Sequence, residues 1–413
     1  MPPLYLWGLG MAPSARASLP KAEYQGRAPA PEHTMEHLVR LGQGPHDLSQ
    51  ASWYALQGGG EVDIERYVVS TTGTRRICNQ PELLGLAYTD ALQQSMAQAL
   101  ATAPFHSLLA AAPETSLCVL HLLRGGLNFG LRAALGQAFG FVRHGSAFMS
   151  SQRCVAGGQW GVTEDSYRKL DIPDGAVLLV GDVVATGVTL EHGLEVIRRH
   201  LRHHGASPRA TVFFTIGGPR AEAALAATHR RWRETFATYQ RTCLVYLEGR
   251  FTLACEETPL RIREPGTDLL RRDAILAPEF ALSQFESPAY PLERCTIYDA
   301  GARAFTIPAY AHDVIDYWEQ VGALAREGWT LREALLERWP EGAPADRAPT
   351  LAAARAAWKG VDATLLQQYL TARQAFWAEL VGPLGSRAES LTTLCDQRLL
   401  ALGKAAGLLG APT

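Results

Sequence analysis

The sequence predicts an α/β protein built on a five-stranded, mostly parallel, doubly wound sheet, with an irregular N-terminal region and a helical C-terminal appendage. Two observations lead to this fold class. Five short apolar runs follow one another at spacings of about 25 to 35 residues with helical patterns between them, which is typical of parallel strands joined by right-handed crossovers. From Pro308 onward, apolar residues recur at helical spacing instead. We therefore divide the chain into residues 1–75, 76–307 and 308–413.

Composition argues against several classes of partner. The 413 residues include 39 basic and 41 acidic ones, and a chain this close to neutral lacks the clustered basic excess of a nucleic-acid-binding protein. No apolar run approaches the roughly 20 residues of a membrane helix, and the first residues lack the basic start of a signal peptide. The 7 cysteines are scattered without a Cys-x-x-Cys pair, which argues against a zinc site or a disulfide framework. We expect a cytoplasmic protein with neither a nucleic-acid nor a membrane partner.

The N-terminal region is rich in Pro, Gly, Ala and Ser, and a strand is expected in it only over residues 67–71. A helix is predicted after Pro81, where apolar residues recur at every fourth position: Leu84, Tyr88, Leu92 and Met96. The first core strand then covers residues 117–123 and ends in Arg124-Gly125-Gly126. Two glycines let a backbone approach an anion closely, and an arginine adds a charged fork.

A helix over residues 131–138 and a second core strand over 141–149 follow. The polar stretch from Ser150 to Lys169 has no strong periodicity, and we predict a long loop there. Loops of this length are usually functional lids or disordered segments.

The central motif covers residues 176–190, Ala-Val-Leu-Leu-Val-Gly-Asp-Val-Val-Ala-Thr-Gly-Val-Thr-Leu. An uninterrupted apolar run bounded by turn residues is typical of a buried parallel strand. Gly181-Asp182 end that run, and a helix is predicted from the spacing of Leu190, Leu194, Ile197 and Leu201. A strand, an acid, a loop with threonine and glycine, and a helix N-terminus together favour a bound phosphate.

Two further strands complete the sheet, residues 210–216, which end at Gly217, and residues 242–247. Ligands of such sheets bind beyond the carboxyl ends of the strands. Arg124, Asp182 and Gly217 are all predicted to lie at that edge.

The central motif is neither a nucleoside-triphosphate P-loop nor a dinucleotide fingerprint, because the spacings of both are absent. It resembles the phosphoribosyl pyrophosphate (PRPP) motif of type I phosphoribosyltransferases, in which four apolar residues, two acids and two or three apolar residues precede Thr-Gly-x-Thr. Here Gly181 stands at the first acidic position. The resemblance extends from Pro81 to about Gly249, and the order of motifs is nearest to uracil phosphoribosyltransferase. It rests on residues 123–127, 167–170 and 185–189.

This resemblance implies a magnesium-dependent pentosyltransferase that moves the 5-phosphoribosyl group from PRPP to a nucleobase-like nitrogen heterocycle and releases pyrophosphate. The residues implied to bind PRPP are Arg124, Gly125, Gly126, Asp182, Ala185, Thr186, Gly187, Val188 and Thr189. Of these, Asp182 and Arg124 are also implied in catalysis, together with Arg153 from the predicted lid. Asp182 is the one candidate protein ligand for Mg²⁺, which would be held mostly by pyrophosphate and ribose oxygens.

The acceptor site is implied by a shorter similarity. Asp299-Ala300-Gly301 resembles part of the segment with which uracil enzymes bind their base, although Tyr298 and Ala302 depart from that pattern. With Gly217, these residues are the candidate acceptor contacts. We also expect a homodimer.

The C-terminal region predicts at least four helices. The first carries Val314, Tyr317 and Trp318, and the second begins at a capping box, Thr330 to Glu333, and stops before Pro340. Two more are marked by apolar residues of 365–380 and 391–399. Such an appendage would cover the acceptor site, mediate dimerisation, or do both.

Two alternatives to an enzyme of this kind stand beside it. A non-catalytic PRPP- or nucleotide-binding regulatory protein is motivated by Gly181, since a lost acid is typical of a degraded site. A phosphatase or hydrolase would need a nucleophile and base pair, and the sequence has no Gly-x-Ser-x-Gly motif. The identity of the acceptor stays open between uracil, another nucleobase and a specialised heterocycle.

Overall fold

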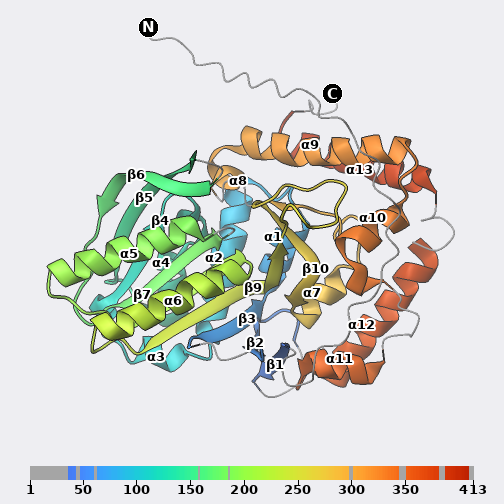
Figure 1. Ribbon diagram of the computed structural model, residues 1–413. Coiled ribbons are helices and arrows are strands. Elements are labelled where there is room, and N and C mark those ends of the chain that lie inside the picture. The colour runs from blue at the N-terminus through green and yellow to red at the C-terminus, as the bar shows by residue number, and fades with distance from the viewer. Residues whose placement is uncertain are drawn as a thin grey trace, which may run out of the picture.

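A computed structural model describes residues 36–42, 47–59, 63–156, 159–184, 187–296, 301–343, 350–380 and 387–408, with the backbone alone for 151–166, 295–296 and 379–380. Figure 1 shows a twisted sheet with helices α5 (Val188–His203) and α6 (Pro219–Thr235) side by side in front of it. The C-terminal helices lie to the right of the sheet in this view. The sheet carries the core, since strands β4 (Leu117–Leu122) and β8 (Ala210–Gly217) are buried along their whole length.

The five predicted core strands lie next to one another and are all parallel. Their order is β9-β8-β7-β4-β5, with β9 at Arg241–Leu253, β7 at Val177–Val184 and β5 at Gly145–Ala156. Apolar residues without alternation suit strands that are covered on both faces. The α/β class is thereby confirmed.

The predicted size of the sheet is wrong. Within the described ranges it has 12 strands, in the order β12-β1-β2-β3-β9-β8-β7-β4-β5-β6, and β10 and β11 continue from β9. The additional strands are β1 (His37–Leu41), β2 (Ser52–Gln57), β3 (Glu65–Ser70), β6 (Gln159–Lys169), β10 (Asp268–Leu276), β11 (Cys295–Thr296) and β12 (Trp358–Lys359).

The N-terminal region is less irregular than its composition predicts. Its described part supplies β1, β2 and β3, and β3 pairs in parallel with β9, so that Glu65 lies opposite Cys243. Strand β3 matches the strand expected over residues 67–71, whereas the five- and six-residue strands β1 and β2 were not predicted. At the far edge β1 pairs with β12 from the C-terminal region, Leu38 opposite Trp358.

The predicted loop over residues 150–169 is also wrong. Strands β5 and β6 form an antiparallel hairpin from Phe148 opposite Lys169 to Ala156 opposite Gln159, with two register shifts. In the sheet order β6 is an edge strand, and an edge hairpin that is open to water needs no apolar alternation. The polar composition that suggested a loop therefore fits a strand pair equally well.

The helices follow the predicted pattern. The remaining ones in the first two thirds of the described chain are α1 (Thr72–Asn79), α2 (Gly85–Ala101), α3 (His106–Ala110), α4 (Leu131–Phe139) and α7 (Pro278–Ser283). Those beyond residue 300 are α8 (Ala302–Phe305), α9 (Ile307–Arg326), α10 (Leu331–Arg338), α11 (Leu351–Ala357), α12 (Ala363–Ala375) and α13 (Ala388–Ala405). The predicted capping box is present, since Thr330 Oγ1 accepts from Glu333 N at 3.2 Å and the Glu333 carboxylate accepts from Thr330 N at 2.9 Å. In the described part of the chain, no helix is both long and apolar enough to span a membrane.

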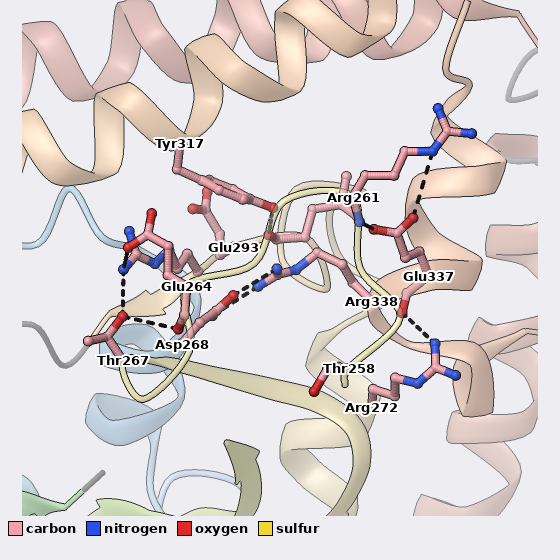
Figure 2. A network of polar contacts seen from close by, with 12 residues as sticks. Thr258, Arg261, Glu264, Thr267, Asp268, Arg272, Glu293, Tyr317, Glu337 and Arg338 are labelled. Atoms are coloured by element: carbon pink, nitrogen blue, oxygen red, sulfur yellow. Dashed lines mark hydrogen bonds and ion pairs between the residues drawn. The ribbon is translucent and has the colours of Figure 1, made fainter. Parts of the chain in front are cut away.

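Buried ion pairs join the C-terminal helices to the β10 edge of the sheet (Figure 2). The Arg338 guanidinium of α10 donates to both oxygens of Asp268, at 2.9 and 3.1 Å, and both side chains are at most 3% exposed. Nearby, Arg294 contacts Asp313 of α9 at 3.0 Å, and Tyr317 of α9 donates to Leu292 O at 2.7 Å. If a helix moved away, the charge of its buried partner would remain without a counter-charge, which is costly. These contacts therefore hold the helices in their place against the sheet.

Candidate functional site

Three of the predicted site residues, Arg124, Asp182 and Gly217, lie at the carboxyl edge of the parallel strands. Arg124 follows β4, Asp182 lies near the end of β7, and Gly217 closes β8. The register places Asp182 opposite Thr215 and Val184 opposite Gly217. Adjacent parallel strands end at the same side of the sheet, so the order of the strands alone brings the first two motifs together.

The turn after β4 packs onto the end of β7. Leu123 N donates to Met149 O at 2.8 Å, the Leu123–Arg124 peptide bond is cis, and a short 3-10 helix runs from Gly125 to Phe129. A Cβ on Gly126 would lie 3.0 Å from Gly181 O, which is tighter than most carbon contacts. Glycine at 126 therefore allows the turn to touch β7 directly.

Gly181, the residue at the motif's missing acidic position, is explained by packing. A Cβ on Gly181 would lie 2.7 Å from both Cβ and Cδ1 of Phe129, whose side chain is fully buried. Carbon atoms normally stay about 3.5 Å apart or more. No side chain fits at position 181 while Phe129 occupies this place. Sequence reasoning missed Phe129, because nothing in its neighbourhood along the chain points to β7.

Asp182 faces the opposite side of β7, since successive side chains of a strand alternate. Its side chain is half-buried, and its Oδ1 accepts from Val183 N at 2.9 Å. The acid is thus held at the rim of the sheet. Such a place suits a carboxylate that contacts sugar hydroxyls.

Helix α5 begins at Val188, shortly after Asp182 in the chain. Gly187 precedes it with φ 82°, a left-handed conformation that favours glycine, and α5 then runs for 16 residues. Its first backbone N–H groups have no partner within the helix and carry the positive end of the dipole. The Thr189 hydroxyl is buried and has no hydrogen-bond partner in the part of the chain that the structure describes. These groups are what a phosphate would bind.

A buried histidine lies beneath the turn after β4 and was not predicted. His121 is 6% exposed, and its ring stacks on Phe148 with centroids 4.8 Å apart. Burial lowers the pKa of this imidazole from 6.5, so it is neutral at physiological pH. A lone polar residue within an apolar strand run was the only signal in the sequence.

The other predicted site residues are placed only in part. Ala185, Thr186, Asp299 and Ala300 lie outside the described residues. For Arg153 the backbone alone is described, opposite Val162 in the β5–β6 hairpin. The roles predicted for these five residues stay predictions.

Gly217 and Gly301 are both described. A Cβ on Gly217 would lie 2.7 Å from Val184 O, so this glycine lets β8 and β7 approach each other closely. Gly301 is buried at the start of α8. Their predicted contacts with an acceptor stay predictions.

Arg303, two residues after Gly301, anchors α8 to the end of α1. Its guanidinium donates to Ile77 O at 2.9 Å, Gln80 O at 2.6 Å and Leu83 O at 2.8 Å. The side chain is 9% exposed. This arginine therefore has a structural role.

Arg124 itself contacts the C-terminal helices. Its Nη1 donates to Thr306 Oγ1 at 3.2 Å, between residues that are 182 positions apart in sequence. The turn after β4 thus lies against the end of β7 and contacts the start of α9. An exposed arginine in this turn, and the N–H groups at the start of α5, are groups that can bind an anion.

Comparisons with known proteins give distant structural similarity only. Neither a protein-family model nor a curated protein matches the sequence. Among solved structures, the chain is similar to the AQ2163 protein from Aquifex aeolicus, with 17% identity and a TM-score of 0.30 over 45% of this chain and 89% of that one. It is also similar to a hypoxanthine-guanine phosphoribosyltransferase from Bacillus anthracis, with 17% identity and a TM-score of 0.20 over 31% of this chain and 67% of that one. A hypothetical protein from Neisseria gonorrhoeae with bound ppGpp gives 15% identity and a TM-score of 0.20 over the same shares, 31% and 67%. Likenesses this distant concern the fold alone.

Proposed function

We propose that the protein transfers the 5-phosphoribosyl group of PRPP to a ring nitrogen of a nucleobase-like heterocycle and releases pyrophosphate. One observation carries the proposal: the Arg124 turn packs against the end of β7. A Cβ placed on Gly126 would lie only 3.0 Å from Gly181 O. The turn after β4 therefore lies against the strand that carries Asp182, and α5 begins at Val188, shortly after that strand ends at Val184. A ligand with a phosphate at one end and a pyrophosphate at the other suits the arginine turn and the start of α5.

Each of the two has a role in the proposed reaction. The N-terminus of α5 and the Thr189 hydroxyl hold the 5-phosphate, together with the adjoining residues Ala185 and Thr186. Arg124 and the backbone of its turn hold the pyrophosphate. Asp182 binds the ribose hydroxyls and stabilises the positive charge that develops at C1 in the transition state.

The bond changes are simple. The bond between C1 and the pyrophosphate oxygen breaks, and the oxygen keeps the electron pair. The acceptor nitrogen forms a bond to C1 and loses its proton to solvent. Arg124 stabilises the charge on the leaving oxygen, and Arg153 of the hairpin adds to it. Gly217, Asp299, Ala300 and Gly301 are the proposed contacts of the acceptor.

Magnesium enters with PRPP. One half-buried carboxylate, Asp182, fits a contact with Mg²⁺ made directly or through water, and Mg²⁺ usually keeps several waters and phosphate ligands. The ion neutralises charge on the pyrophosphate when it is bound. The protein's own share is to orient both ends of the substrate.

Release of pyrophosphate tests the proposal. The protein is incubated with Mg²⁺, PRPP and one nucleobase at a time, and we expect release with at least one base. Arg124→Ala is expected to lower kcat/KM for PRPP about 100-fold, because removal of one transition-state donor typically has effects of that size. Arg209→Ala is the matched control, since Arg209 is exposed at the opposite end of β8. Release that Arg124→Ala leaves unchanged would contradict the proposed site. PRPP binding without release from any base would favour the non-catalytic regulatory alternative.

A further inference from the structure

The N-cap of α9, Thr306, contacts the proposed PRPP site. This threonine stands between α8 and α9, and its hydroxyl accepts a hydrogen bond of 3.2 Å from Arg124 Nη1. We propose that Thr306 is a positioning residue, which holds the Arg124 guanidinium ready for the pyrophosphate end of the substrate. The inference rests on the proposed function and assigns part of the site to the N-cap of α9.

The local structure around Thr306 departs from what a threonine at this position usually does. Thr306 is the N-cap of the 20-residue helix α9, where a threonine hydroxyl normally accepts from a backbone N–H of the first turn. In α9 the hydroxyl makes no such capping bond. By contrast, the threonine N-caps of α1, α10 and α11 all make it. The hydroxyl of Thr306 is therefore turned to Arg124 instead of to its own helix.

Thr306 is held firmly enough to position another side chain. Its N–H donates to Ala302 O at 2.9 Å, and its carbonyl accepts from Ala309 N at 3.0 Å and Tyr310 N at 3.2 Å. One turn earlier, Arg303 is fixed by its three carbonyl partners, and its guanidinium also lies 4.6 Å from the ring centroid of Tyr88. Thr306 therefore has a fixed place relative to α1 and α2.

Arg124 needs such support. Its side chain is exposed, on a turn that leaves the sheet, and a long exposed side chain loses rotamer freedom when it binds a ligand. A hydrogen bond already present in the free protein reduces this loss, which is the general effect of preorganisation. Because Thr306 is the N-cap of α9, affinity for the pyrophosphate end depends on α9 being docked.

The hydroxyl is tested by calorimetry of PRPP binding in the presence of Mg²⁺ and by the kinetics of pyrophosphate release. Thr306→Val keeps the shape and removes the acceptor, and we expect PRPP affinity to fall about fivefold, as for one hydrogen bond to a charged group near the surface. KM should rise in proportion while kcat changes less than about twofold, since uniform binding is lost. Thr306→Ser restores the hydroxyl and should bind within about twofold of the wild type. Thr371→Val, an exposed threonine of α12, is the matched control.

The outcomes separate this inference from the function it rests on. If the wild type binds PRPP and Thr306→Val binds equally well, the positioning role is wrong and the proposed function stands. If Thr306→Ser is as weak as Thr306→Val, the hydroxyl alone does not restore binding, and the positioning role assigned to the hydrogen bond is wrong. In the background of Arg124→Ala, Thr306→Val should have no further effect, and an additive loss would overturn the proposal. Thr306→Ala serves as a second variant without the hydroxyl if Thr306→Val unfolds at a lower temperature. A wild type that does not bind PRPP overturns both.

Discussion

Restoring the acid that the PRPP motif lacks should damage this protein. Gly181→Asp places a Cβ 2.7 Å from Cβ and Cδ1 of the buried Phe129 ring, about 0.8 Å closer than the usual limit of about 3.5 Å between carbons. Overpacking of this kind typically costs about 1–3 kcal/mol. The carboxylate would also be placed in an apolar environment, which adds to the cost. We therefore expect Gly181→Asp to lower the free energy of unfolding by about 3 kcal/mol or more, and Gly181→Ala by about 1–3 kcal/mol.

The assay is equilibrium unfolding in urea, together with calorimetry of PRPP binding. Gly145→Ala is the matched control, because Gly145 is also part of a core strand, and its Cβ would meet nothing nearer than Leu117 O at 3.7 Å. That control should change stability by less than about 0.5 kcal/mol. In the background of Phe129→Ala, which removes Cγ and Cδ1, the cost of Gly181→Ala should shrink by about 1 kcal/mol, because the two positions are in contact.

The result that would refute this reasoning is specific. A Gly181→Asp protein as stable as the wild type, with tighter PRPP binding, would show that position 181 is open to an acid. Gly181 would then be a loss in the site and not a requirement of packing. The regulatory alternative, which was motivated by that loss, would gain support.

Two further predictions concern stability. Arg338→Met leaves Asp268 buried without its partner and should lower the free energy of unfolding by about 3–5 kcal/mol. The double variant Asp268→Leu, Arg338→Met should recover most of this loss. Urea unfolding of both variants is the measurement, and equal losses would contradict the role of the pair. Burial raises the pKa of Glu248 to about 7, so between pH 4.5 and 7 the folded state binds more protons than the unfolded state, and stability should fall as pH rises through this window. Burial also raises the pKa of Glu293 to about 7, which adds a similar dependence of stability on pH. Each of the two groups contributes a slope of at most about 1.4 kcal/mol per pH unit. Glu248→Gln should make the measured slope shallower, and an unchanged slope would show that Glu248 does not titrate there.

The centre of the fold could be predicted because its signals are local. Strands β4, β7 and β8 are buried on both faces, so each appears as an apolar run that needs no knowledge of its partner. The turn residues that follow them, Arg124 and Asp182, then take their place at the carboxyl edge from strand order alone. The same short segments therefore indicate both the strands and the candidate site residues that follow them.

The remainder depends on partners that are distant in sequence. The β5–β6 hairpin is polar, and β1 pairs with β12 from the C-terminal part of the chain. Gly181 appears as a defect until Phe129 is seen against it. Thr306 meets Arg124 across 182 positions, a contact that no local pattern encodes. These features depend on contacts between residues that are distant in sequence, and the strand or helix preference of the single residues does not reveal them.

Direct binding of PRPP tests the central claim most closely. Calorimetry with Mg²⁺ and PRPP on the wild-type chain should show one saturable site, and Asp182→Ala and Arg124→Ala should each weaken it at least about 10-fold, the equivalent of about 1.4 kcal/mol. Both variants should unfold at the same urea concentration as the wild type, because Arg124 is exposed and Asp182 half-buried. Absence of PRPP binding by the wild type, or binding that neither substitution changes, would contradict the account.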